Sequence, residues 1–251
     1  GGSGSFNVGD SDVGNIQDGF SSITIGDAAS GTGVVDIDSA TFVDVLTIVG
    51  GSISVTELVA NDTADNGDGT GLQAITLVAR TGAVTDGGDA GTDITGSDLV
   101  VTSTTGVGTS VNGIETAVAR LEAVGGTGGV FVSNTGDLTI GGIGATNGVS
   151  ASNANISVTV TGTTTVSEAV NSGGGDIALT ASDAIILTSA NADVTTGGGT
   201  FTVDADSDND GTGTYTQDDA GSVVTTSTGT VSITAGDIVL TGTINAGAGI
   251  V

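Results

Sequence analysis

The stretches Gly173–Ala181 (GGGDIALTA) and Gly197–Ala205 (GGGTFTVDA) follow one pattern. Each opens with glycines and then alternates apolar residues with small or polar ones, as a short β-strand does after a tight turn. The related motif of Gly-Asp, apolar residue, spacer and apolar residue occurs at Gly136–Gly142 (GDLTIGG) and Gly236–Gly242 (GDIVLTG). An imprecise period in the twenties with glycine-rich corners is typical of a solenoid.

The composition favours a narrow core of small side chains. The chain has 46 Gly, five Phe and one Tyr, and it lacks Trp, Met, Pro and Cys. Its apolar material is Val, Ile, Leu and Ala in groups of two or three, which suits layers stacked one on another. A β-sandwich also has many short strands, but it would usually bury a Trp or several larger rings. We therefore expect an all-β, right-handed parallel β-helix or β-solenoid, with tandem sandwiches as the alternative.

Short alternating runs bounded by Gly, Asp or Asn predict strands on both sides of residues 106–127. The expected strands of the N-terminal part are Ser22–Ile25, Val34–Ile37, Phe42–Val49, Ser52–Val59, Ile75–Ala79 and Asp98–Thr102. Those of the C-terminal part are Val130–Val132, Asp137–Ile140, Ile156–Val160, Asp176–Thr180, Ala184–Thr188, Thr200–Val203, Val223–Thr226, Thr230–Thr234 and Asp237–Leu240. We expect N-terminal coils with acidic loops (1–105), a helix-containing insert (106–127) and C-terminal coils (128–251) with an acidic loop at 204–219.

Residues 112–124 (NGIETAVARLEAV) predict one short lateral α-helix. Asn112 and Glu115 have the spacing of a capping box. The residues that would share one helical face are Ile114, Ala117, Val118, Leu121 and Val124. Docking that face on the coils would leave Glu115, Arg120 and Glu122 in solvent. Such a helix would serve as a lateral patch or spacer, or it would cover an exposed sheet edge.

Three runs resemble the repeats of very large bacterial β-strand-repeat surface proteins, which are similar to adhesins of the filamentous haemagglutinin type. They are Gly19–Gly26 (GFSSITIG), Gly50–Val55 (GGSISV) and Thr116–Gly142 (TAVARLEAVGGTGGVFVSNTGDLTIGG). The resemblance implies export, a right-handed parallel β-helix, and a role as stalk, adhesin or filament at the bacterial surface. No catalytic residue carries over, because the resembling runs contain none.

The charge balance excludes one class of partner. With 29 acidic and two basic residues the net charge is −27, whereas nucleic-acid binding needs Lys and Arg against the phosphates. Binding to an anionic membrane surface is disfavoured in the same way, and the apolar runs are too short for membrane insertion. The chain begins with GGSGS and lacks Met, so we expect an internal piece of a longer protein, whose signal or anchor sequences would lie outside it.

One acidic segment resembles the opening of a calcium loop. Asp at the first, third and fifth positions followed by Gly is the pattern of such a loop. The candidate calcium ligands are Asp204, Asp206, Asp208, Asp210 and Thr212. The twelfth position is Gln217, where a bidentate Glu is expected, so an acidic loop in solvent is the alternative. The segment Gly87–Asp93 (GGDAGTD) misses the calcium-binding nonapeptide by one position and occurs once, so we expect no site there.

The residues available for catalysis are few. Nucleophile chemistry of the Ser–His or Cys–His type is impossible without His and Cys, and sugar-acid substrates usually require Lys or Arg. We therefore expect no enzyme and no cofactor other than calcium. The favoured function is a structural segment of an extracellular filament, sheath or stalk, with neighbouring segments or copies of itself as partners. The alternatives are an adhesin segment that binds surface glycans or cells, and a polysaccharide-active β-helix enzyme.

Overall fold

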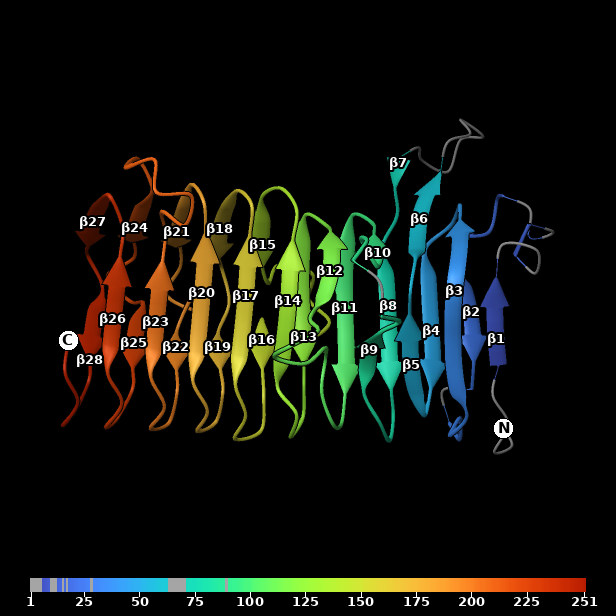
Figure 1. Cartoon of the computed structure of the whole chain (residues 1–251), viewed down its shortest axis with the longest axis horizontal. Helices are drawn as coiled ribbons and strands as arrows, with labels where there is room; N and C mark the ends of the chain where they lie inside the picture. The colour runs from blue at the N-terminus through green and yellow to red at the C-terminus, as the bar shows by residue number, and fades with distance from the viewer. Residues whose placement is uncertain are drawn as a thin grey trace.

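The molecule is an elongated stack of parallel strands. The computed structural model describes residues 6–9, 13–14, 16, 18–27, 29–62, 71–88 and 90–251, and the elements assigned within them are all β-strands. They form two sheets of 13 and 15 strands that run the length of the molecule (Figure 1). The expected parallel β-solenoid is confirmed.

The strands follow the chain in order. The N-terminal ones are β1 (Phe6–Gly9), β2 (Ile23–Gly26), β3 (Val34–Phe42), β4 (Leu46–Gly50), β5 (Ser52–Val55), β6 (Leu58–Asp62), β7 (Gly71–Leu72), β8 (Ile75–Ala79), β9 (Val84–Asp86), β10 (Ile94–Thr95), β11 (Asp98–Ser103), β12 (Ile114–Ala117) and β13 (Arg120–Val124). The C-terminal ones are β14 (Val130–Asn134), β15 (Leu138–Ile140), β16 (Val149–Ser150), β17 (Ile156–Val160), β18 (Thr163–Val166), β19 (Val170–Asn171), β20 (Ile177–Ala181), β21 (Ala184–Leu187), β22 (Val194–Thr195), β23 (Phe201–Asp204), β24 (Thr214–Gln217), β25 (Val223–Thr225), β26 (Val231–Thr234), β27 (Asp237–Leu240) and β28 (Thr243–Asn245). Strands β6 and β7 pair in antiparallel orientation, unlike the parallel strand pairs of the coils.

From β14 onward each coil consists of three strands, and the same strand of successive coils pairs in register. Val130 pairs with Ile156, Ile156 with Ile177, Ile177 with Phe201, and Phe201 with Val231. The coils between these partners differ in length: the shortest runs from Ile156 to Ile177 and the longest from Phe201 to Val231. The two GGG stretches that begin at Gly173 and Gly197 lead into β20 and β23, which are neighbours in one ladder, as their likeness predicts.

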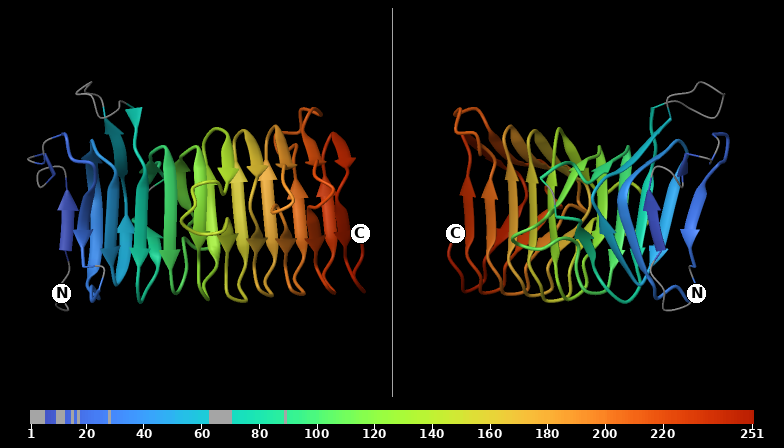
Figure 2. Two further views of the ribbon diagram at one scale, coloured as in Figure 1. Left: turned by 180° about the vertical axis from the view of Figure 1, so that it is seen from behind. Right: turned by 45° about the vertical axis from the view of Figure 1, so that its right-hand side comes forward.

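The N-terminal coils continue the same stack. Ile23, Leu46, Ile75, Leu99 and Leu121 pair in succession along the second sheet. In two further views the coils follow one another along the long axis in the order of the sequence (Figure 2). The stack is thus continuous from β2 to β28.

Corner glycines repeat from coil to coil because the coils approach each other closely there. Gly173 and Gly197 both have φ of +68°, a left-handed conformation that favours glycine. A Cβ on Gly199 would collide with the carbonyl oxygen of Gly175 in the preceding coil. The glycines that open each repeat therefore allow the corners of successive coils to come this close, because a side chain would not fit there.

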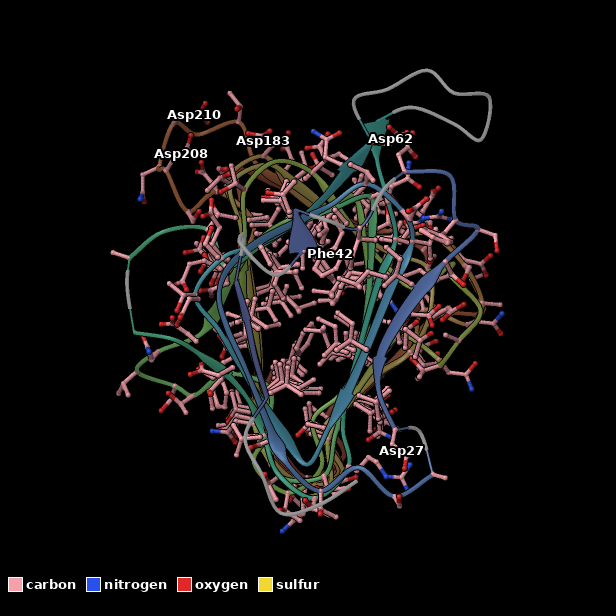
Figure 3. The ribbon with its side chains drawn as sticks, turned by 90° about the vertical axis from the view of Figure 1, so that its right-hand side faces the viewer. Asp27, Phe42, Asp62, Asp183, Asp208 and Asp210 are labelled. Atoms are coloured by element: carbon pink, nitrogen blue, oxygen red, sulfur yellow. The ribbon has the colours of Figure 1, made fainter. Side chains whose placement is uncertain are left out.

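The core consists of ladders of inward side chains, which fill the interior in a view along the stack (Figure 3). One ladder runs through Leu138, Thr164, Ile185, Tyr215 and Ile238. Its members from Leu138 to Tyr215 are buried. Aliphatic side chains dominate the core, and Tyr215 and Phe201 are its largest fully buried members.

The predicted helix at 112–124 is wrong. This segment forms β12 and β13, which pair on both sides with neighbouring coils. Ile114, Thr116 and Val118 are buried at a spacing of two, so the run fits the strand period as well as the helical one. A helix of this length is marginal by itself, and pairing with β10 and β14 satisfies the backbone instead.

The expected exposure of Glu122 is also wrong. Its side chain is 0% exposed and accepts four backbone hydrogen bonds. Oε1 accepts from the N–H groups of Ile143 (2.8 Å) and Gly144 (2.7 Å), and Oε2 from those of Ala145 (2.9 Å) and Thr146 (2.6 Å). Glu122 therefore fastens the loop after β15 to the coil.

Arg120 does face solvent, where its guanidinium pairs with Asp98 in the preceding coil at 2.6 Å and 2.8 Å. It also donates to the carbonyl oxygen of Gly142 at 2.9 Å. Arg120 therefore links two neighbouring coils and the loop after β15 on the outer surface.

Candidate functional site

The predicted calcium ligands lie in and beside the loop 205–213, which connects β23 to β24 (orange, upper edge of Figure 1). The carboxylates of Asp206, Asp208 and Asp210 each place an oxygen within 4.8 Å of the others. Asp208 and Asp210 lie on the outer rim of the coil, away from the core (Figure 3). Three of the five predicted ligands therefore come together at the surface.

Backbone and hydroxyl donors already hold this loop. The N–H of Gly211 donates to both oxygens of Asp206 at 3.2 Å. Oδ1 of Asp210 accepts from the Thr212 hydroxyl at 2.7 Å and from the Thr212 N–H at 2.8 Å. These bonds to Thr212 keep the pKa of Asp210 below its ordinary value.

Of the other two predicted ligands, Thr212 lies in the same loop and donates to Asp210, whereas Asp204 lies beside the loop. Asp204 ends β23, and its Oδ1 accepts from the N–H of Asp206 at 3.3 Å. Gln217 is buried, and its Nε2 donates to the carbonyl oxygens of Ser222 (2.9 Å) and Thr243 (3.1 Å). The twelfth position of the motif thus faces the core, and calcium binding by the loop stays a prediction.

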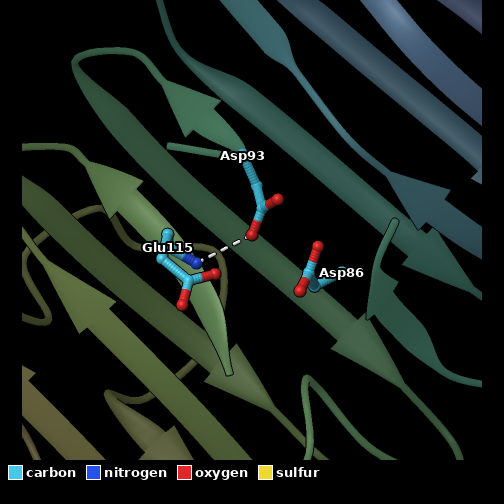
Figure 4. Close-up of side chains that lie close together, drawn as sticks. All are labelled: Asp86, Asp93 and Glu115. Atoms are coloured by element: carbon cyan, nitrogen blue, oxygen red, sulfur yellow. Dashed lines mark hydrogen bonds between the residues drawn. The ribbon is translucent and has the colours of Figure 1, made fainter. Parts of the chain in front are cut away.

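A second acidic cluster was not predicted. It joins Asp86 at the end of β9, Asp93 directly before β10, and Glu115 in β12 (Figure 4). An oxygen of each lies within 4.8 Å of the others. Because Asp93 and Glu115 lie in successive coils, only the register of β10 against β12 reveals their contact. The helix predicted for 112–124 had placed Glu115 in solvent.

The contacts of Asp93 anchor the cluster. Its Oδ2 accepts from the N–H of Glu115 at 2.8 Å, and its side chain is 0% exposed. Burial raises the pKa of Asp93 to about 8, and the nearby charges of Asp86 and Glu115 act in the same direction. The three carboxylates therefore oppose one another's ionisation, because they lie close together where water screens their charges little.

The last coil is a third distinctive surface. The inward residues Ile238 and Leu240 of β27 are 50% and 52% exposed, although their partners Tyr215 and Gln217 in the preceding coil are buried. Their aliphatic side chains continue the core ladders to the end of the stack, where no further coil of the described chain covers them.

The edge of β27 also carries unpaired backbone groups. Asp237 and Thr241 donate their N–H groups back to Gly213 (3.2 Å) and Gln217 (2.8 Å). Alternate residues of a strand direct their N–H groups to opposite sides, so those of Ile238 and Leu240 point away from the stack. The outer edge of β27 thus offers a template for a further parallel strand, from residues that follow in a longer chain or from a second copy.

Fold and surfaces together define a parallel β-solenoid protein with an acidic surface, whose last described coil exposes apolar side chains. Comparisons with protein-family models, curated proteins and solved structures find no match. In the part of the chain that the structure describes, no helix is long and apolar enough to cross a membrane.

Proposed function

We propose that this protein is a non-catalytic structural segment of an extracellular bacterial filament, sheath or stalk, in which coils associate end to end. The observation that supports it is the continuous stack of in-register parallel coils, whose last described coil still exposes Ile238 and Leu240 and the outer N–H groups of β27 to a further coil. A coil of the same construction, from a neighbouring segment or a second copy, would complete both the apolar ladders and the backbone pairing.

The charge of the molecule sets the conditions of this association. A net charge of −27 repels other copies at low ionic strength. At 1 M salt the screening length falls to about 3 Å, so end-to-end contact is opposed far less. Association is therefore expected to increase with salt, which is the reverse of an interaction held by ion pairs.

Sedimentation velocity and negative-stain electron microscopy at low and high NaCl concentration test the proposal. The wild-type chain should form end-to-end rods whose length grows with protein concentration and salt. Leu240→Asp places a charge on the open end and should abolish the rods. The matched control is Val111→Asp, because Val111 is an apolar residue that is 93% exposed and lies away from the last coil; this variant should associate like wild type.

Two outcomes would overturn the proposal. Wild-type protein that stays monomeric in all conditions would remove its basis, as would rods that Leu240→Asp leaves unchanged. A glycan array separates the adhesin alternative: a stalk segment gives no signal, whereas specific glycan binding that Leu240→Asp does not alter would favour the adhesin.

A further inference from the structure

The cluster of Asp86, Asp93 and Glu115 has three oxygens that lack a partner among the described residues. Oδ2 of Asp86, Oδ1 of Asp93 and Oε2 of Glu115 are shielded from solvent and accept no hydrogen bond from that part of the chain. Buried polar atoms without a partner are rare, because each costs the hydration it has lost. Three such atoms on three neighbouring carboxylates require an explanation.

The rest of the cluster is held in place by the backbone. Oδ1 of Asp86 accepts from the N–H of Gly88 at 2.7 Å, and Oδ2 of Asp93 accepts from the N–H of Glu115 at 2.8 Å. These bonds fix the orientation of two carboxylates by one oxygen each and leave the second oxygen without a donor. These carboxylates therefore have the form of a preorganised ligand set.

The charge of the cluster is not balanced by a basic side chain at hydrogen-bond distance within the described chain. The whole sequence has two Arg and no Lys or His. Arg120 pairs with Asp98, and Arg80 donates to the carbonyl oxygen of Ala29. Neutralisation therefore requires a proton or a cation from solution.

The chemistry and spacing of the oxygens favour the cation. Hard divalent cations take carboxylate oxygens, and calcium binds them at about 2.3–2.6 Å. Two oxygens on one calcium ion can therefore lie up to about 5 Å apart, which accommodates the separations below 4.8 Å found here. Magnesium demands near-ideal octahedral geometry at about 2.1 Å, whereas calcium tolerates irregular sets of carboxylate oxygens.

We propose that Asp86, Asp93 and Glu115 bind a calcium ion, which ties the end of β9 and the start of β10 to β12 in the next coil. One carboxylate oxygen comes from each residue, and water completes the coordination. This site is separate from the surface loop of Asp206, Asp208 and Asp210, and it draws on residues of successive coils rather than on a contiguous motif.

Calorimetric titration of the full chain with calcium near neutral pH, with thermal unfolding followed in calcium and in EDTA, tests the proposal. Wild-type protein should bind calcium and unfold at a higher temperature in its presence. Asp93→Asn removes one ligand charge without changing the shape of the side chain, and it should weaken this binding at least about tenfold and abolish the thermal shift. The matched control, Asp208→Asn in the surface loop, should keep both the calcium binding and the thermal shift of wild type.

Glu115→Gln serves as the second variant if Asp93→Asn fails to fold, because Glu115 is only half buried. It should show the same loss of calcium binding. No heat and no thermal shift with calcium in the wild-type protein would overturn the proposal and leave a proton as the neutralising group. Binding that Asp208→Asn abolishes and Asp93→Asn preserves would also overturn it, because the ion would then lie in the surface loop.

Discussion

Replacing Glu122 with Gln should loosen the loop after β15 and lower the free energy of unfolding. The Gln side chain keeps one oxygen, which accepts from two backbone donors, and presents an amide to the other two. Two charge-assisted bonds worth about 1.5 kcal/mol each are lost, and the two that remain weaken by about 0.5 kcal/mol each. Because Gln is uncharged, the variant no longer incurs the free-energy cost of burying a charge, which offsets about 1 kcal/mol of this loss. The expected net loss is about 3 kcal/mol.

Urea unfolding followed by far-ultraviolet circular dichroism measures this loss, and hydrogen exchange locates it. The amides of Ile143, Gly144, Ala145 and Thr146 should exchange slowly in the wild type and much faster in Glu122→Gln, with little change in distant coils. Glu57→Gln is the control, because Glu57 is exposed and accepts from the Ser39 hydroxyl at 2.9 Å. It should stay within about 0.5 kcal/mol of wild type.

The pH dependence gives the same prediction an independent readout. Burial raises the pKa of Glu122, but the four backbone hydrogen bonds outweigh burial and hold this pKa below its ordinary value. The unfolded chain therefore takes up the proton first. Glu122 contributes its stabilisation above the unfolded pKa, and this contribution is lost as pH falls through the folded pKa. Wild type and Glu122→Gln should thus converge in stability as pH falls below about 4. Equal urea midpoints at neutral pH, with unchanged exchange at residues 143–146, would refute the reasoning.

Three further substitutions test the ladders and corners by urea unfolding. Thr164→Val should stabilise the protein by about 1 kcal/mol, because the Thr164 hydroxyl is buried in the ladder between Leu138 and Ile185 without a partner in the described chain. Thr159→Val, on the exposed face, is the control and should leave the free energy of unfolding unchanged. Leu179→Ala should cost about 3 kcal/mol through the cavity it leaves in a fully packed ladder, and a loss below about 1 kcal/mol would show that the ladder collapses around it. Gly126→Ala should cost at least about 2 kcal/mol, since φ is +49° and the new Cβ would meet the carbonyl oxygen of Thr104; a neutral result would contradict the close approach of the corners.

The strands that the sequence predicts well are the ones with alternating side chains. Ile156–Val160 was predicted with the bounds that the structure has, and Ala184–Thr188 differs from β21 by a single position. The very short strands β16, β19 and β22 could not be predicted in this way. A pair of residues carries no period, and each of these strands exists only because the coils above and below present matching ones.

The segment 112–124 shows the limit of local patterns. Its apolar residues satisfy the helical and the strand period together, and only the flanking coils decide between them. Because this segment was predicted as a helix, Glu115 was expected in solvent and its contact with Asp93 was missed. Asp206, Asp208 and Asp210 are close in sequence, so their grouping could be predicted from spacing. The meeting of Asp93 with Glu115 depends on the register between coils, which no local motif encodes.

The unequal coil lengths have a practical consequence. The short coil from β17 to β20 and the long coil from β23 to β26 occupy the same step of the stack. The extra residues of the longer coil lie in the loop 205–213 and in the turn between β24 and β25, and the strands on either side return to the same register. The length of the rod is therefore set by its number of coils and not by its number of residues. A foreign peptide spliced into this loop would be displayed at the side of the rod without changing its pitch, and a series of such loops would place cargo at regular heights along it.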